Sequence, residues 1–355
     1  MSTILAIERY LPPFRYGQEV VTDWIKAWLT EVPGHDSARL LSVYAAAGVK
    51  SRGSVAPIEE VLFPKDFETQ NDRYRESMIT AGKDVARRAL AASGVSPQEI
   101  GLVVSVSCTG FMIPAVDAYV ADALGLGPRL VRLPITESGC AGGVVGLARA
   151  AEFLSVHPGQ AALVLALEFA SLTFQRWDRS ATNVISAAIF GDGGAAVVLV
   201  GREHPRFAEG RVRVLDAESH FFPGTSHFMG FRLRNQGLQI ILDRDLTPFV
   251  RREVAGAIQG FLVRRDLTRA DVTRWILHPG GRKIIEAMTE QLGLAPQDLA
   301  ATEHVLSEHG NMSSVTVLFV LEEILRTGAP IPGEKGVLGA FGPGFGAEFA
   351  LLEFR

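Results

Sequence analysis

Three polar residues stand beside glycines and have the chemical types that a nucleophilic enzyme needs. Cys140 lies in TESGCAGG, His278 in LHPGG and Asn311 in EHGNMSS. A cysteine thiolate is a strong nucleophile, histidine can act as its base or cationic partner, and asparagine can donate hydrogen bonds to a developing oxyanion. Together the three residues predict covalent catalysis at Cys140, although each one alone also has an ordinary structural explanation.

Cys140 is expected where a strand passes into a helix. A helix N-terminus carries a partial positive charge and free N–H groups, and both stabilise a thiolate. Gly139, Gly142 and Gly143 allow a sharp turn and leave room for a bulky acyl group. The competing interpretation is a buried structural cysteine. That interpretation suits Cys108, the other cysteine, better because Cys108 ends an apolar run.

The other two candidates also keep structural alternatives. His278 ends the apolar run WILH, at the kind of strand end where α/β active sites collect. A buried histidine with satisfied hydrogen bonds would fit the same place. Asn311 precedes a predicted helix, and asparagine as an N-cap is worth about 1 kcal/mol. His304 and His309 lie close in the sequence, but no cysteine or carboxylate cluster completes a metal set, so we expect no metal site.

Alternating apolar strands and helices must position these residues. Strands are predicted at 101–108, 130–135, 161–168 and 275–281. Another strand is predicted after the glycine turn within 189–201, and a pair of strands within 336–354. Helices are predicted at 71–93, 114–124, 142–153, 248–262, 283–292 and 313–325, and the first hundred residues are expected to be mostly helical. This alternation predicts an α/β fold with buried sheets.

A faint internal repeat links the two halves of the chain. GCAGGVVGLARAAEFL resembles GNMSSVTVLFVLEEIL, and FGDGGAAVVLV resembles FGPGFGAEFALL. Two copies of one βα unit would place Cys140 and Asn311 at equivalent helix starts, facing one cavity. Short joins from glycine to helix are common, so the repeat remains a hypothesis. No low-complexity linker separates the halves, and we expect them to form one body.

Composition narrows the possible function classes. Hydrophobic residues make up 47% of the 355 residues and charged residues 21%, with a net charge of −4. This balance gives no sign of a nucleic-acid or anionic-membrane partner. The apolar runs are shorter than the ~20 residues of a membrane span, and the start lacks a signal-peptide pattern. We expect a cytoplasmic protein with reduced thiols. GPGFG at 342–346 lacks the spacing of a dinucleotide-binding loop.

Taken as a set, the motifs resemble those of type III polyketide synthases, the chalcone-synthase-like enzymes of the thiolase superfamily, in their bacterial form. The matching segments are RLPITESGCAGG, AIFGDGGAAVV, LHPGG, GNMSS and GAFGPG, and the resemblance runs from about Lys50 to Phe354. It implies a thiolase-like fold of two related βαβαβαββ halves in five layers, α-β-α-β-α. Residues 1–207 would carry Cys140, and residues 208–355 would carry His278 and Asn311.

The resemblance also implies a reaction. Cys140 would accept an acyl starter from a thioester carrier, with the His278 imidazolium holding the thiolate. His278 and Asn311 would then stabilise the enolate that forms when a malonyl thioester loses CO₂. Claisen condensation on acyl-Cys140 would follow, and the product would be a pyrone, a resorcinol or a related ring. Neither metal nor redox cofactor is implied, and the substrates are coenzyme A or acyl-carrier thioesters.

Further positions match the cavity wall of the family. Phe190 matches a phenylalanine between acyl cavity and substrate tunnel, and Ile113 matches the residue that enters the partner's cavity across a homodimer interface. The other matching wall positions are Cys108, Thr109, Thr173 and Ser313. Two positions depart from the plant pattern: Ile240 replaces an aromatic gatekeeper and Phe231 replaces a glycine of the cavity floor. We therefore expect an aliphatic acyl or malonyl starter rather than a phenylpropanoid one.

Carrier recognition is the part that matches least. Relatives hold the coenzyme A phosphates with several basic side chains. Arg39 matches one such position, whereas Ser42 and Ala46 replace two others. Lys50 and Lys283 are the remaining candidates for contact with the carrier. Weaker phosphate contacts would favour delivery by an acyl carrier protein; ordinary surface drift, or a local misalignment, is the competing explanation.

Three other functions use similar residue types. A single-condensation ketosynthase could act on carrier-protein-bound chains or join two chains, but FGPGFG and GNMSS favour the polyketide synthase. A Cys-His-Asn hydrolase is possible in principle, but the chain has no cysteine-protease signature. A non-catalytic acyl-binding protein would not need all three of Cys140, His278 and Asn311.

Overall fold

The computed structural model describes residues 1–31 and 37–355, except for the side chains of 37–39. The strands within these residues are β1 (Ser2–Tyr10), β2 (Phe14–Gly17), β3 (Ser51–Ser54), β4 (Ile100–Val106), β5 (Val131–Ile135), β6 (Ala161–Phe169), β7 (Asp192–Gly201), β8 (Val212–Phe221), β9 (Met229–Arg234), β10 (Gly237–Leu242), β11 (Arg274–Leu277), β12 (Lys335–Gly342) and β13 (Gly346–Phe354). The helices are α1 (Gln18–Thr30), α2 (Ser37–Ala46), α3 (Ile58–Leu62), α4 (Phe67–Ser93), α5 (Val116–Leu124), α6 (Gly142–Val156), α7 (Ala181–Ile189), α8 (Leu246–Val263), α9 (Arg282–Leu292), α10 (Ala300–His309) and α11 (Thr316–Thr327). Every predicted helix and strand is present, with ends shifted by a few residues.

One nine-stranded sheet joins the two halves of the chain. Its order is β11-β12-β13-β8-β1-β7-β6-β4-β5. The halves meet where β1 pairs with β8 through Ser2–Val214, Thr3–Arg213 and Ile4–Val212. On its other side β1 pairs with β7 along most of its length. The first strand is therefore the seam between the halves.

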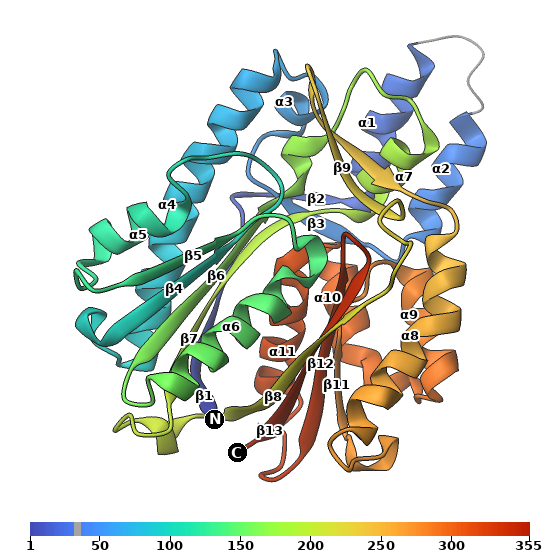
Figure 1. The fold of residues 1–355 in the computed structure, drawn as a ribbon. Coiled ribbons are helices and arrows are strands. Elements are labelled where there is room, and N and C mark those ends of the chain that lie inside the picture. The colour runs from blue at the N-terminus through green and yellow to red at the C-terminus, as the bar shows by residue number, and fades with distance from the viewer. Residues whose placement is uncertain (32–36) are drawn as a thin grey trace.

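The layers alternate helix and sheet, as predicted. Helices α6 and α11 lie between the two groups of strands, α4 and α5 cover the outer face of the first group, and α8 and α9 cover the outer face of the second (Figure 1). Strand β6 shows why the sequence gives this arrangement. Leu163, Leu165 and Leu167 pack in the outer core, while Ala162 and Val164 pack in the central core. Because both faces are buried, the strand is apolar except for Glu168 near its end.

The sequence did not predict β1, β2, β3, β8, β9 and β10, and two of these omissions have a visible cause in the sequence. The first hundred residues are not simply helical, because β1 is a central strand. The sequence hides it because Glu8 and Arg9 interrupt the apolar pattern. Both are partnered: Glu8 pairs with Arg88, and Arg9 donates to the Phe319 carbonyl at 2.8 Å. The second difference is the β9–β10 hairpin, which alternates apolar and polar residues and is a separate two-stranded sheet.

The most apolar long helical segment belongs to the core. Residues 139–156 are long and apolar enough to cross a membrane, and 61% of this segment is buried inside the fold. Burial on this scale is typical of a core helix of a globular protein. The segment begins one residue before Cys140, so the helix that supports the candidate nucleophile is the central helix of the molecule.

Candidate active site

Cys140 lies in a short 3-10 turn, Gly139–Ala141, that leads directly into α6. The glycines around it are required by close approach and backbone conformation. Gly139 has φ +48°, in the region that favours glycine. A Cβ on Gly142 would overlap the Val106 side chain, and one on Gly143 would overlap the Ser314 carbonyl oxygen. The GCAGG motif thus lets the start of α6 touch the GNMSS segment, which brings Asn311 to Cys140.

Asn311 is held from both its main chain and its side chain. Its backbone N–H donates to the Ile189 carbonyl at 2.9 Å, and its carbonyl accepts from Gly191 N at 3.0 Å. The carboxamide Nδ2 donates to the Gly280 carbonyl at 3.0 Å, and Oδ1 accepts from Ser313 N at 2.8 Å. The side chain also lowers the pKa of the Cys140 thiol. Asn311 is not the N-cap of α11, which is Val315, so the capping interpretation is wrong in detail, and its catalytic role stays a prediction.

His278 is buried with an unused imidazole. Its backbone N–H donates to the Gly339 carbonyl at 2.8 Å, which fixes the residue at the end of β11. The residue is 2% exposed, and neither ring nitrogen has a hydrogen-bond partner among the described residues. Leaving a buried polar group unpaired costs about 1–3 kcal/mol. This contradicts the alternative of a satisfied core histidine and leaves both nitrogens for the reaction.

Burial opposes charge on either partner alone. Desolvation is the main cause that raises the pKa of the Cys140 thiol to about 11, and the Glu168 carboxylate acts in the same direction. Hydrogen bonding with Ser313 and Asn311 has smaller, lowering effects on this pKa. Desolvation also lowers the pKa of His278 to about 3. Transfer of the thiol proton to the imidazole within the site adds no net charge. The thiolate–imidazolium pair stays a prediction, and this proton transfer is the step that would form it.

Glu168 is a site residue that the sequence analysis missed. Its fully buried carboxylate accepts from Ser314 Oγ at 2.7 Å, Thr109 Oγ1 at 2.9 Å and Cys108 N at 3.0 Å. Burial raises its pKa despite these hydrogen bonds. It thereby joins the end of β4 to the GNMSS segment behind Cys140. A carboxylate inside the apolar run AALVLALEF was the available signal, because such a group is rarely buried without a purpose.

Cys108 sits between the site and this carboxylate. Its sulfur lies 3.5 Å from a Glu168 oxygen and 3.6 Å from Ser313 Oγ. Burial, followed by the Glu168 charge, raises the pKa of the Cys108 thiol well above its usual value. The thiol is therefore kept protonated, in agreement with the structural role expected for Cys108, although the residue also lines the cavity.

A cavity of about 390 Å³ opens at Cys140. Seven of the predicted wall residues line it: Cys108, Thr109, Thr173, Phe190, Phe231, Ile240 and Ser313. The rest of the wall is mainly apolar, and the prediction did not include Phe111, Met229, Leu233, Leu238, Ile241 and Leu242. Phe231 and Ile240, the two departures from the plant pattern, are cross-strand partners in the β9–β10 hairpin. One hairpin thus shapes a large part of the wall.

The chain also matches a known protein family. The model of chalcone and stilbene synthases matches with its N-terminal domain at residues 64–204 and with its C-terminal domain at residues 213–354. The chain belongs to the chalcone and stilbene synthase family. These matches confirm the family predicted from the motifs around Cys140, His278 and Asn311.

Two bacterial enzymes are similar to this chain over nearly their whole length. The chain is 36% identical over 353 residues to the 1,3,6,8-tetrahydroxynaphthalene synthase of Streptomyces peucetius subsp. caesius, covering 99% of this chain and 93% of the relative. It is 30% identical over 361 residues to the phloroglucinol synthase of Pseudomonas fluorescens, covering 100% and 99%. The crystal structure of 1,3,6,8-tetrahydroxynaphthalene synthase from Streptomyces coelicolor A3(2), a bacterial type III polyketide synthase, superposes with a TM-score of 0.94 at 28% identity, covering 99% of each chain.

These findings confirm three predictions. The fold is thiolase-like, the chain is a type III polyketide synthase, and its class is that of acyl-transferring ketosynthases. They do not favour the alternative of a single-condensation ketosynthase, because the named relatives make polyketide products. The division into residues 1–207 and 208–355 stays a prediction.

Three residues were predicted to contact the carrier, and the structure describes the side chains of two of them, Lys50 and Lys283. The side chain of Arg39 lies outside the described residues. Lys50 is exposed and lines a surface groove of about 670 Å³ together with Arg282, Glu303 and Glu308. Lys283 is exposed beside this groove and does not line it, whereas its neighbour Arg282, which the sequence analysis missed, does.

Ile113 is the one predicted substrate-contacting residue that does not line its own chain's cavity. It is 102% exposed. No cluster of three or more His, Cys, Asp or Glu side chains suited to a metal occurs within residues 1–31 and 37–355. Near the predicted histidines, His304 Nε2 lies 3.8 Å from a Glu323 oxygen, and the His309 ring packs on Phe319.

Proposed function

We propose that this enzyme loads an aliphatic acyl or malonyl starter on Cys140 and extends it by decarboxylative Claisen condensation with malonyl thioester. One observation carries the assignment of roles. The Asn311 carboxamide lowers the pKa of the Cys140 thiol, and it donates to the Gly280 carbonyl in the turn that follows His278. Cys140 itself lines a largely apolar cavity.

Acyl loading uses the unpartnered imidazole. His278 takes the proton of the Cys140 thiol, and the sulfur attacks the carbonyl carbon of the starter thioester. The carrier thiolate then leaves and takes the proton from the imidazolium, which restores neutral His278. The site is uncharged before and after the step, which suits its burial.

Chain extension uses the hydrogen-bond donors. The malonyl thioester breaks its bond to the carboxylate carbon and releases CO₂, and the electron pair forms an enolate on the thioester oxygen. An Asn311 Nδ2 group has two N–H donors. One is engaged by Gly280, and the other is available to the enolate oxygen once Cys140 is acylated. The carbanion attacks acyl-Cys140, the new carbon–carbon bond forms, and the thiolate leaves.

The substrates and products follow the chemistry of the cavity. We propose coenzyme A thioesters as carriers, with acyl-carrier-protein delivery as the alternative, and no metal or redox cofactor. The apolar wall and Ile240 support an aliphatic starter. Relatives named for tetrahydroxynaphthalene, phloroglucinol and α-pyrone synthesis support a product that closes into a ring. We also propose a cytoplasmic location for the enzyme.

We propose that the enzyme works as a homodimer. Strand β5 ends the sheet and has no partner strand on its outer side among the described residues. Val131 on this strand is 48% exposed and Ile113 is fully exposed. Exposed apolar groups at a sheet edge favour pairing with a second copy. Sedimentation should show a dimer, and Ile113→Asp should shift it toward monomer; a monomeric wild-type enzyme would contradict the proposal.

Product analysis tests the function. The enzyme is incubated with malonyl thioester and a panel of acyl starters on coenzyme A and on an acyl carrier protein, and products are identified by mass spectrometry. Cyclised polyketides should form, and open β-ketoacyl products alone would support a single condensation. Cys140→Ala should abolish the acyl-enzyme adduct while retaining some malonyl decarboxylation. Chain synthesis by that variant would show that the nucleophile is assigned wrongly.

A further inference from the structure

The start of strand β3 contacts the C-terminal ends of two helices that lead into the site. On one side it holds α10. The backbone N–H of Lys50 donates to the Ser307 carbonyl at 2.7 Å. Ser51 Oγ donates to the Glu308 carbonyl at 2.9 Å. Both carbonyls belong to the last turn of α10, which ends two residues before Asn311, so this contact fixes the point from which Asn311 follows.

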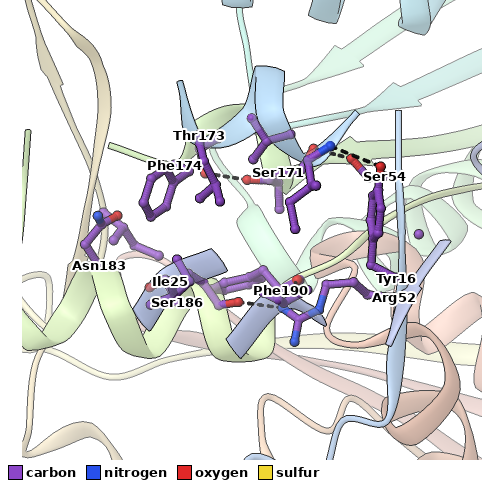
Figure 2. Close-up of a pocket in the computed structure, with 18 residues that line it drawn as sticks. Tyr16, Ile25, Arg52, Ser54, Ser171, Thr173, Phe174, Asn183, Ser186 and Phe190 are labelled. Carbon is purple, nitrogen blue, oxygen red and sulfur yellow. Dashed lines mark hydrogen bonds between the residues drawn. The ribbon is translucent and has the colours of Figure 1, made fainter. Parts of the chain in front are cut away.

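On the other side Arg52 holds the end of α7. Its Nη1 donates to the carbonyls of Ala187 at 2.6 Å and Phe190 at 2.7 Å, and its Nη2 donates to the Ala188 carbonyl at 2.7 Å. The guanidinium lies beside Phe190 in Figure 2. A cation is favoured here because the C-terminus of a helix carries a partial negative charge. Arg52 therefore fixes the helix end that carries Phe190.

The two helix ends are also bonded to each other. The Asn311 N–H donates to the Ile189 carbonyl at 2.9 Å, and the Gly191 N–H donates to the Asn311 carbonyl at 3.0 Å. Phe190 and Asn311 thus form a bridge between their two segments. The space around this bridge is filled, because a Cβ placed on Gly191 would lie 3.0 Å from the Cβ of Arg52. A shift of the α7 end would therefore move Asn311 as well.

The guanidinium provides this contact although its burial opposes folding. Arg52 is 6% exposed, and burial lowers its pKa to about 10, so the side chain stays a cation at neutral pH. Gln18 Oε1 also accepts from Nη2, but Nε is buried without a hydrogen-bond partner among the described residues. A buried donor without a partner is unfavourable. The planar fork of arginine nevertheless reaches three carbonyls at once, which a lysine amine or an apolar side chain could not do.

We propose that Arg52 is a positioning residue for chain extension, which sets the place of the Asn311 carboxamide through the bridge between Phe190 and Asn311. This inference rests on the proposed function, in which Asn311 donates to the enolate oxygen. Loading of Cys140 depends instead on His278, whose main chain is bonded to β12 and not to the end of α7. Loss of the guanidinium should therefore slow extension more than loading.

Two rates are compared in each enzyme. Loading is followed by intact-protein mass spectrometry of the adduct that hexanoyl-CoA forms on Cys140, and extension is followed by CO₂ release when malonyl-CoA is added to the loaded enzyme. Arg52→Met should lower extension about 10²-fold more than loading, because misplacement of a reacting group by about 1 Å has an effect of that size. Arg52→Lys keeps the charge and part of the contact, so its ratio should lie between the two.

Arg265 provides a matched control. Its side chain is 12% exposed, and its Nη1 donates to the Phe261 carbonyl in the last turn of α8 at 2.8 Å. It does not line the Cys140 cavity, so Arg265→Met should lower stability and leave the ratio of extension to loading unchanged. Ser51→Ala removes a contact with α10 and should lower the ratio by a smaller factor. This variant and Arg52→Lys decide the question if Arg52→Met fails to fold by circular dichroism.

A double variant tests the route through Asn311. If Arg52 acts by placing the carboxamide, Arg52→Met should lower the ratio no further in an enzyme that already carries Asn311→Ala. An additional loss in the double variant would show that Arg52 acts by another route and would overturn the inference. An unchanged ratio in folded Arg52→Met, or in both Arg52→Lys and Ser51→Ala, would do the same, as would an equal change in Arg265→Met.

Failure of the proposed function would look different from failure of this inference. In that case the wild-type enzyme itself would form no adduct on Cys140 or release no CO₂ from malonyl-CoA. The ratio of extension to loading could then not be defined for any variant, whereas the inference fails only in an enzyme that carries out both steps.

Discussion

The carboxamide of Asn311 donates to the carbonyl oxygen of Gly280 at 3.0 Å, although the two residues come from separate loops. This bond sets the carboxamide plane, so that the oxygen of the same group accepts from Ser313 N, and the side chain lowers the pKa of the Cys140 thiol. The loop after β11 and the loop before α11 are thereby locked together.

Asn311→Ala should separate chain loading from chain extension. The variant loses the donor that we assign to the enolate oxygen, and loss of one such donor lowers a rate by about 10²–10³. Acylation of Cys140 by the starter should persist, because we assign transfer of the thiol proton to His278 and not to Asn311. Intact-protein mass spectrometry measures the acyl-enzyme, and CO₂ release measures decarboxylation. Equal losses in both measurements would remove the assigned role.

His278→Ala should reveal the pKa of the isolated Cys140 thiol. Burial raises that pKa to about 11, so below it the thiolate fraction rises about tenfold for each pH unit. In the wild type, proton transfer to the imidazole should make iodoacetamide labelling nearly independent of pH between about 7 and 9. The gap between the two enzymes should therefore narrow as the pH rises. Parallel pH profiles would contradict a thiol–imidazole pair.

Glu168→Gln should make the thiol more acidic. The Glu168 carboxylate raises the pKa of Cys140, and removal of a like charge favours the thiolate, so the pKa should fall. The cleanest comparison uses the His278→Ala background, where the labelling profile reports the thiol alone. The double variant should reach its labelling midpoint at a lower pH than the single variant. A shift to higher pH would show that the lost hydrogen bonds outweigh the charge.

Phe231→Ala should change products without changing the nucleophile. Phe231 lines the Cys140 cavity opposite Ile240 in the hairpin, so its removal enlarges the space for the growing chain. We expect larger or further extended polyketides in the product mass spectrum. Arg232→Ala is the matched control, because Arg232 is the next residue, is exposed and does not line the cavity. Identical product spectra for both variants would exclude this role of Phe231.

Arg52→Met should cost stability far more than Arg52→Lys. The methionine leaves three buried carbonyls at the end of α7 without their donor, and each costs about 1–3 kcal/mol. Lysine keeps the positive charge at the helix C-terminus and some of the bonds. The free energy of unfolding, measured by urea denaturation, should order the enzymes as wild type, lysine, then methionine. Similar values for the two variants would contradict this explanation.

Local sequence signals were sufficient for the chemistry and for most of the layers. Cys140 and Asn311 were recognisable because glycines surround them at predicted helix starts, and the structure shows what those glycines permit. The strand β6 was recognisable because burial on both faces leaves only apolar residues, with Glu168 as the exception. The family motifs then supplied the cavity wall, since a residue's place in a motif fixes its place on the fold.

What the sequence did not reveal depends on contacts between distant segments. Strand β1 looked unlike a core strand because Arg9 and Glu8 find partners in α11 and α4. The unpartnered ring of His278 is a property of its whole surroundings and not of the HPGG motif.

The seam at β1 also has a consequence for how the polypeptide acquires its shape during synthesis. Ser2 takes its place between Gly201 and Val214, so the strand made first is completed by strands that leave the ribosome much later. Until then an apolar segment has no neighbours to cover it, and contacts this far apart in sequence close slowly. We therefore expect the nascent chain to depend on chaperone protection until β7 and β8 have emerged.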